Sequence, residues 1–216
     1  MYKSLLETTN NTRALSGKIW RTDAVNELSA ADKLMLTEKG LTEFIDMRND
    51  DEVKKRPCAM EGESDFTYHH LSISEGAAPP STLEGVPLSY MRIAQAENIA
   101  AVFHAIADAS DGVLFGCTAG KDRTGVVSAV LQLLRGDDDV TIINGYVISR
   151  EYNKKRLEEY LASHPEVDRE VVLANEKSME NFLGLFREKF GTAENYLHTL
   201  GLSEQEIQIL RDKMTV

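Results

Sequence analysis

The chain has 216 residues, and its 24 Lys and Arg against 35 Asp and Glu leave a net charge of −11 at pH 7. With 42% hydrophobic and 27% charged residues, its composition excludes a disordered chain, a collagen-like chain and a coiled-coil rod. The acidity argues against nucleic acid as a partner, so any anionic ligand needs a local positive pocket.

Two cysteines, Cys58 and Cys117, are too few for a disulfide framework or a metal cluster. The first residues lack the apolar run of a signal peptide, and no apolar run approaches the roughly 18 residues that cross a membrane. We therefore expect a cytoplasmic protein with free thiols, no metal or other cofactor and no stable membrane insertion. A reversible disulfide between the two cysteines stays open as a redox alternative.

The first half of the chain mixes predicted strands with predicted helices. Ser29 and Asp32 have the spacing of a helix-capping box and predict a helix through Lys39, ended by Gly40. Apolar residues at helical spacing predict a second helix at 97–110. Short apolar segments predict strands at 19–21 (an edge strand), 42–47, 68–73 and 113–115.

Residues 74–89 contain several Gly and Pro residues, which predicts a long loop of the kind that acts as a lid. Helices are expected in the remainder, at 126–134, 140–162, 168–190, 192–200 and 203–214. Mixed elements followed by helices alone predict an α/β protein. We expect one domain over residues 1–216, with a mostly parallel central sheet flanked by helices and a helical C-terminal layer.

The segment from Cys117 to Gly125 lies between an apolar strand and an apolar helix. Backbone N–H groups at a helix N-terminus are unpaired and carry partial positive charge, so this position suits a phosphate. Arg123 offers a planar fork for two phosphate oxygens, and Gly120 and Gly125 let the backbone approach the ligand closely and take unusual φ angles. The residues expected to surround the phosphate are Thr118, Ala119, Gly120, Lys121 and Gly125.

The same field favours the thiolate of Cys117 at neutral pH. We therefore expect nucleophilic attack on phosphorus, a cysteinyl-phosphate intermediate and its hydrolysis. Arg123 would stabilise the transferred group, and Thr124 would donate a hydrogen bond to the sulfur as it leaves. The alternative, that Cys117 is simply a small buried side chain, does not explain the cations and glycines beside it.

These residues resemble the Cys-x5-Arg-Ser/Thr loop of the cysteine-dependent protein tyrosine phosphatase superfamily. The form Ala-Gly-Lys-Asp-Arg-Thr-Gly is similar to that of its bacterial tyrosine/dual-specificity family, which also contains phosphoinositide phosphatases. Weaker similarities at 19–23, 46–52 and 190–203 extend the resemblance over a catalytic core at about 13–214.

The resemblance implies an α/β phosphatase fold and metal-free hydrolysis of phosphomonoesters. Phosphotyrosine proteins are the first substrate class that it implies. Lys121 is associated with phosphoinositide-active members, so a phosphoinositide or small phosphate is the alternative. Gly116 departs from the family, which usually has His there, and favours a pseudophosphatase that only binds phosphate. For an active enzyme, we expect Gly116→His to speed turnover or leave it unchanged.

The leaving oxygen needs a proton donor, and many relatives place an Asp about 30–40 residues before the cysteine. Residues 66–107 contain no Asp. Asp122 is therefore the first candidate for the general acid, with shaping of the loop as its alternative role. Glu75 is the second candidate, and Asp46 is a third whose alternative role is structural.

Two charged features upstream of the loop have simpler explanations. Arg48 and Glu52 lie four residues apart, which favours a surface ion pair over a role in orienting the site. The basic run 54–56 is more typical of a solvated loop than of a surface that receives an anionic substrate.

Overall fold

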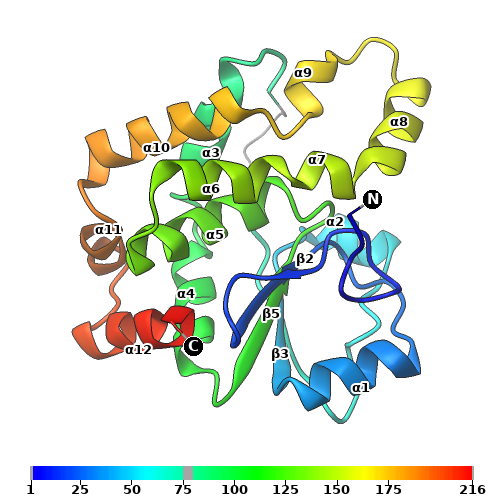
Figure 1. The fold of residues 1–216 in the computed structure, drawn as a ribbon, viewed down its shortest axis with the longest axis vertical. Helices are drawn as coiled ribbons and strands as arrows, with labels where there is room; N and C mark the ends of the chain where they lie inside the picture. The colour runs from blue at the N-terminus through cyan, green and yellow to red at the C-terminus, as the bar shows by residue number, and fades with distance from the viewer. Residues whose placement is uncertain (1, 75–79, 216) are drawn as a thin grey trace.

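The computed structural model describes residues 2–74 and 80–215, built around one five-stranded sheet (Figure 1). The strands follow the order β1-β2-β5-β3-β4; β1 runs antiparallel to β2, and the other neighbours are parallel. The mostly parallel sheet that the sequence predicts is thus confirmed. The strands are β1 (Arg13–Ala14), β2 (Ile19–Thr22), β3 (Leu41–Asp46), β4 (Thr67–His70) and β5 (Gly112–Gly116).

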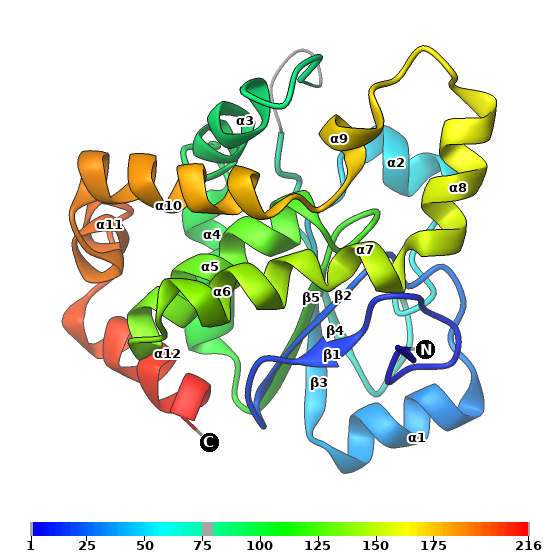
Figure 2. The same cartoon turned by 45° about the horizontal axis from the view of Figure 1, so that its top comes forward.

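Helices cover both faces of the sheet, most of them on one face (Figures 1 and 2). They are α1 (Ala30–Glu38), α2 (Asp50–Lys55), α3 (Gly85–Ile93), α4 (Ile99–Asp108), α5 (Asp122–Arg135), α6 (Asp139–Val147), α7 (Ser149–Tyr152), α8 (Lys154–Ser163), α9 (Arg169–Val172), α10 (Glu176–Phe190), α11 (Ala193–Thr199) and α12 (Glu204–Thr215).

Alternating side chains of the central strand β5 feed two separate cores. Val113 and Phe115 pack into the larger core, which also takes side chains from α3–α6 and α10–α12. Leu114 points to the opposite face and packs with Leu36 of α1. This two-residue alternation is what a strand buried on both faces requires, and it anchors the end of β5 rigidly.

Two expected strands and one expected capping box differ from the structure in the first third of the chain. The strand at 19–21 is not an edge strand, because the two-residue β1 pairs outside it. The strand expected at 68–73 is β4, which ends at His70, three residues before the expected end. Ser29 does cap α1 by accepting from the amide of Asp32. The Asp32 carboxylate makes no return bond, since it accepts instead from the backbone of Glu7 and Thr8.

The expected loop at 74–89 is wrong at its end, because α3 already begins at Gly85. Pro87 fits there, since the first turn of a helix has no partner for the N–H that proline lacks. Glu75 lies outside the described residues. The long helices expected at 140–162 and 168–190 are also wrong as single units: they are divided into α6, α7 and α8, and into α9 and α10. Among the described residues, no helix is long and apolar enough to cross a membrane.

Candidate functional site

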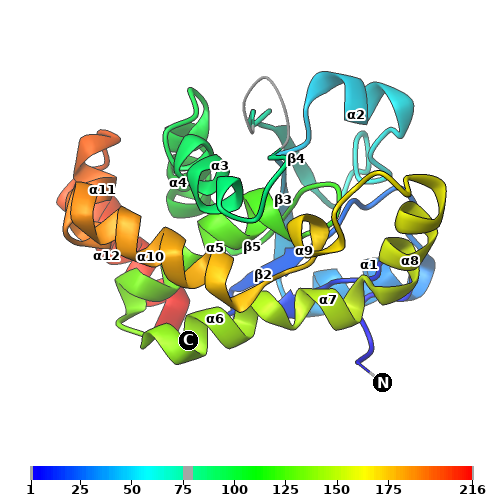
Figure 3. The same ribbon diagram turned by 90° about the horizontal axis from the view of Figure 1, so that it is seen from above.

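The segment singled out from the sequence connects the carboxyl end of β5 to the N-terminus of α5. The helix begins at Asp122, inside the segment rather than after it. Seen from above, α2, α8 and α9 surround this end of the sheet (Figure 3). The loop from Cys117 to Lys121 therefore opens between the sheet and these short helices.

Gly116 holds the loop against the sheet by being small. It lies between Thr22 of β2 and Asp46 of β3. A Cβ atom here would lie 2.8 Å from the carbonyl oxygen of Thr22, closer than real contacts allow. This contact argues against the expectation that Gly116→His speeds turnover or leaves it unchanged, because a side chain here would have to displace the backbone of β2.

Side chains from outside the loop hold its carbonyl groups. Asn11 Nδ2 donates to the oxygens of Ala119 and Gly120, each at 3.0 Å. The remaining bonds run from Arg21 Nη2 to Gly120 O (2.7 Å), from Asn153 Nδ2 to Ala119 O (3.0 Å) and from Arg156 Nη1 to Thr118 O (2.5 Å). In a trans peptide the next N–H points opposite to the carbonyl. The N–H groups of residues 119–121 therefore point away from these side chains, as an anion-binding loop requires.

Gly120 makes this conformation possible, with φ of +61°. A Cβ on it would also lie 2.6 Å from the backbone oxygen of Thr22. Both the left-handed backbone and the close approach to β2 exclude other residues.

Arg21 lies fully buried beneath the loop, within electrostatic range of Cys117. Burial and then the nearby Arg13 lower the pKa of its guanidinium well below the usual value, while Cys117 acts in the opposite direction. None of the four carbonyl-binding side chains was assigned a role at the loop from the sequence. Arg21 carries a signal only as part of the family-like segment 19–23. The other three come from distant segments with no local pattern: Asn11, Asn153 and Arg156.

Cys117 is 2% exposed and lies at the base of the loop. The hydroxyl of Thr124, in the first turn of α5, donates to its sulfur at 3.2 Å. Gly125 follows directly and lets Tyr146 of α6 pack against the helix. The unusual φ expected at Gly125 is wrong, because this residue lies inside α5 and does not have a positive φ.

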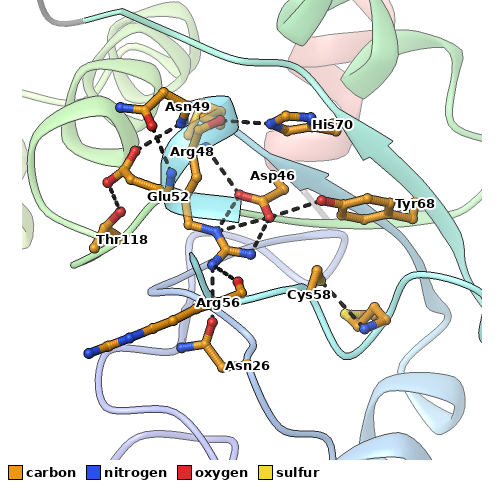
Figure 4. Close-up of polar contacts among 12 residues, drawn as sticks. Asn26, Asp46, Arg48, Asn49, Glu52, Arg56, Cys58, Tyr68, His70 and Thr118 are labelled. Atoms are coloured by element: carbon orange, nitrogen blue, oxygen red, sulfur yellow. Dashed lines mark hydrogen bonds and ion pairs between the residues drawn. The ribbon is translucent and has the colours of Figure 1, made fainter. Parts of the chain in front are cut away.

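Arg123 reaches back across the loop to α2. Its Nη1 donates to Glu52 Oε2 at 2.6 Å and to the carbonyl of Met47 at 3.1 Å, and its Nη2 donates to Glu52 Oε1 at 2.9 Å. The hydroxyl of Thr118 donates to the same carboxylate (Figure 4). Burial alone raises the pKa of Glu52, but the hydrogen bonds and charge of Arg123, with the bond from Thr118, lower it to about 2.

The expected ion pair between Arg48 and Glu52 is therefore wrong. Arg48 turns instead to Asp46, with Nε 3.0 Å from both carboxylate oxygens and Nη2 2.7 Å from Oδ2 (Figure 4). Both side chains are about 1% exposed. Tyr68 donates a further bond to Asp46 at 3.1 Å. The Asp46 carboxylate is thus committed to a buried structural cluster, which argues against it as a proton donor.

Asp122 lies at the loop's rim, with its side chain 26% exposed. Its Oδ1 accepts from the hydroxyl of Tyr90 at 2.7 Å and lies 3.2 Å from Lys121 Nζ. The buried Tyr90 also shares a hydrogen bond with Tyr146, whose pKa burial raises to about 12. Lys121 Nζ donates to the carbonyl of Val172 at 2.7 Å, which ties the loop to the end of α9.

Two of the hollows that border the loop differ in their lining. One, of about 340 Å³, lies beside Lys121 and Asp122 and has an apolar wall. That wall includes Val86, Val167, Val171, Val172 and Tyr160. The other, of about 260 Å³, lies beside Thr118 and Glu52 and is lined by basic side chains.

Comparisons with known proteins agree with this picture. The profile of the tyrosine phosphatase family matches residues 5–216. A tyrosine-protein phosphatase of Nostoc commune is 29% identical over 218 residues, which cover 90% of this chain and 73% of the relative.

Solved structures also resemble the chain, at low similarity. The core catalytic domain of the PP-IP phosphatase SIW14 from S. cerevisiae, in complex with citrate, is 11% identical, with a TM-score of 0.44 over 74% of this chain and 96% of that chain. P. aeruginosa TpbA, in complex with pTyr, is 12% identical, with a TM-score of 0.44 over 89% and 91%.

Proposed function

The chain belongs to the tyrosine phosphatase family, and from this premise we propose that it is a single-domain protein tyrosine phosphatase working through a cysteinyl-phosphate on Cys117. One observation carries the proposal. The sulfur lies at the base of a loop whose carbonyls are bound by side chains from other segments, and it accepts a hydrogen bond from Thr124 in the first turn of α5, the helix that also carries Arg123. Such an arrangement concentrates donors where a phosphoryl group develops charge.

In the first step the Cys117 thiolate attacks phosphorus, and the bond from phosphorus to the ester oxygen breaks. Asp122 gives its proton to the leaving oxygen, since it is a partly exposed carboxyl at the rim of the loop. The backbone N–H groups of residues 119–121 and the guanidinium of Arg123 bind the three oxygens of the transferred group. Glu52 keeps the guanidinium plane fixed while this happens.

In the second step water attacks phosphorus and the bond from sulfur to phosphorus breaks. Asp122 takes the proton from water, so that inorganic phosphate leaves and the acid is restored. Thr124 stabilises the departing thiolate through the hydrogen bond that it already makes to the sulfur. The step returns the enzyme to its starting state without a metal or a cofactor.

Phosphotyrosine is the substrate that this site favours. The apolar wall of the larger hollow, beside Lys121 and Asp122, suits an aromatic ring better than a short serine or threonine side chain. The N. commune relative carries the same activity in its name. Dual specificity and a phosphoinositide or other small phosphate are the alternative substrate classes, which assays with phosphoserine peptides and inositol phosphates would distinguish. We place the enzyme in the cytoplasm because both cysteines are free thiols.

Gly116 no longer favours a pseudophosphatase, because its small size is explained by the contact with Thr22. The test is hydrolysis of p-nitrophenyl phosphate by wild type, Cys117→Ser and Cys58→Ser. Wild type and Cys58→Ser should release nitrophenol, and Cys117→Ser should not. If wild type is as slow as Cys117→Ser, the chain is a phosphate-binding module and the proposal is wrong.

A further inference from the structure

The smaller hollow beside the loop gathers positive charge in an acidic protein. Four of the side chains that line it are basic. Arg48 is paired with Asp46, which leaves Lys55 and Arg56 at the end of α2 and Arg156 in α8. We call it the basic hollow. Thr118 and Glu52 line it too, so it adjoins the proposed phosphate loop directly.

These three cations are not neutralised by the protein. Across residues 2–74 and 80–215, none of Lys55, Arg56 and Arg156 forms an ion pair with a carboxylate. The one carboxylate in the lining, Glu52, is committed to Arg123. Lys55 and Arg56 are exposed, and Figure 4 shows the Arg56 side chain extending away from Asp46 and Arg48.

Local structure explains only part of this cluster. A lysine in the last turn of α2 is favoured by the helix dipole, which accounts for Lys54 and Lys55. It does not account for Arg156, which α8 brings to the same hollow from the far side. Like charges placed together repel one another. The chain has 35 Asp and Glu residues, yet none of them pairs with these three cations among the described residues. An anion from outside the chain is the partner that the basic hollow lacks.

We infer that the basic hollow binds an acidic side chain, a carboxylate or a second phosphate, next to the phosphotyrosine of a peptide substrate. This inference rests on the proposed function. A peptide is favoured over a compact polyphosphate because the hollow beside Lys121 and Asp122 has an apolar wall, whereas the basic hollow lies beside Thr118. An extended chain reaches both hollows, whereas a small ring occupies only one.

The test compares two phosphotyrosine peptides of equal length, with glutamate or alanine on both sides of the phosphotyrosine. The readout is the ratio of their kcat/KM values. Two exposed ion pairs predict a ratio of about five to ten for wild type. In Lys55→Gln/Arg56→Gln the ratio should fall to about one or two, and raising the salt concentration should lower the wild-type ratio. The carbonyl of Arg56, which accepts from Arg48, is kept in this variant.

Lys54→Gln is the matched control, since Lys54 is an exposed neighbour outside the lining of the basic hollow. It should keep the wild-type ratio. Equal ratios in wild type and the double variant would overturn the inference. A soluble inositol bisphosphate is assayed beside the peptides. If Lys55→Gln/Arg56→Gln lowers kcat/KM for this compound alone, the hollow binds a small polyphosphate and the inference is overturned.

Failure of the proposed function gives a different result. If wild type does not hydrolyse p-nitrophenyl phosphate, the enzymatic proposal fails, and the Kd values of the same peptides for Cys117→Ser then test the hollow alone. Tighter binding of the glutamate peptide that Lys55→Gln/Arg56→Gln abolishes would support the inference. Equal Kd values would overturn it.

Discussion

The guanidinium of Arg123 meets the carboxylate of Glu52 in a two-pronged ion pair, with Nη1 2.6 Å from Oε2 and Nη2 2.9 Å from Oε1. The carboxylate is itself held in the first turn of α2, where it accepts from the amide of Asn49 at 2.8 Å. The capping box of α2 thereby sets the orientation of the Arg123 side chain on α5. The position of Arg123 over the loop depends on α2 as much as on α5.

Glu52→Gln should therefore impair catalysis without touching the nucleophile. The amide cannot form the charged fork, so Arg123 loses its fixed plane, and a misplaced catalytic group costs about 10²-fold in kcat/KM. Hydrolysis of p-nitrophenyl phosphate measures the effect. Asp51→Asn is the control, because Asp51 is an exposed acid of the same helix turn. Equal activities in the two variants would contradict the role of the pair.

The same pair predicts a pH dependence of stability. The pKa of Glu52 is lowered from its ordinary 4.5 to about 2. A lowered pKa contributes stability that is present above the ordinary value and is lost as the pH falls through the folded value. The difference in unfolding free energy between wild type and Glu52→Gln should stay constant from neutral pH to about pH 5 and shrink below it. Urea unfolding at several pH values measures this, and a pH-independent difference would contradict it.

Gly116→Ala should destabilise the fold. The new methyl group would meet the backbone oxygen of Thr22 at 2.8 Å, and an overpacked site of this kind costs about 1–3 kcal/mol. Gly184→Ala is the matched control, since no atom lies within 4 Å of a Cβ at that exposed helical position. It should be stabilising by up to about 1 kcal/mol. Thermal unfolding compares the two, and a similar Tm for both variants would show that the sheet tolerates a side chain at 116.

Asp122→Asn should affect substrates according to how much their leaving groups need a proton. Loss of a general acid costs about 10²-fold or more in kcat with phenyl phosphate, whose phenolate leaves poorly. The loss with p-nitrophenyl phosphate should be clearly smaller. Equal losses with both substrates would mean that Asp122 only shapes the loop, through its bond from Tyr90.

The loop and its flanking elements were predictable, because a buried strand, a glycine-rich turn and an apolar helix are local patterns. Gly120 shows this well: its position in the motif predicted unusual backbone geometry, and φ is +61° there. The four side chains that hold the carbonyls were not predictable. Asn11, Asn153 and Arg156 carry no local signal, since only the tertiary fold brings them to the loop. Arg21 lies in the segment 19–23 that resembles the family, but the resemblance gave it no role at the loop.

The wrong partner for Glu52 has a simple physical reason. Four-residue spacing pairs side chains only within a helix, and α2 begins at Asp50, after Arg48. Arg48 lies two residues after the end of β3 and is buried, where it pairs with the carboxylate of Asp46. The breaks at 148 and 153, which separate α6, α7 and α8, were also missed. Asn153 leaves helical geometry there and bonds the carbonyls of Ser149 and Ala119.

The claim that Cys117 is the nucleophile has a direct measurement. Wild type and Thr124→Val are mixed with p-nitrophenyl phosphate, quenched in acid and digested for mass spectrometry. Thr124→Val should accumulate the intermediate, because the sulfur loses its hydrogen bond as it leaves. We expect one phosphoryl group on the peptide that contains Cys117, and none on the peptide of Cys58, whose thiol pKa burial raises to about 11. Turnover with no phosphoryl group on Cys117 in either protein would contradict the account.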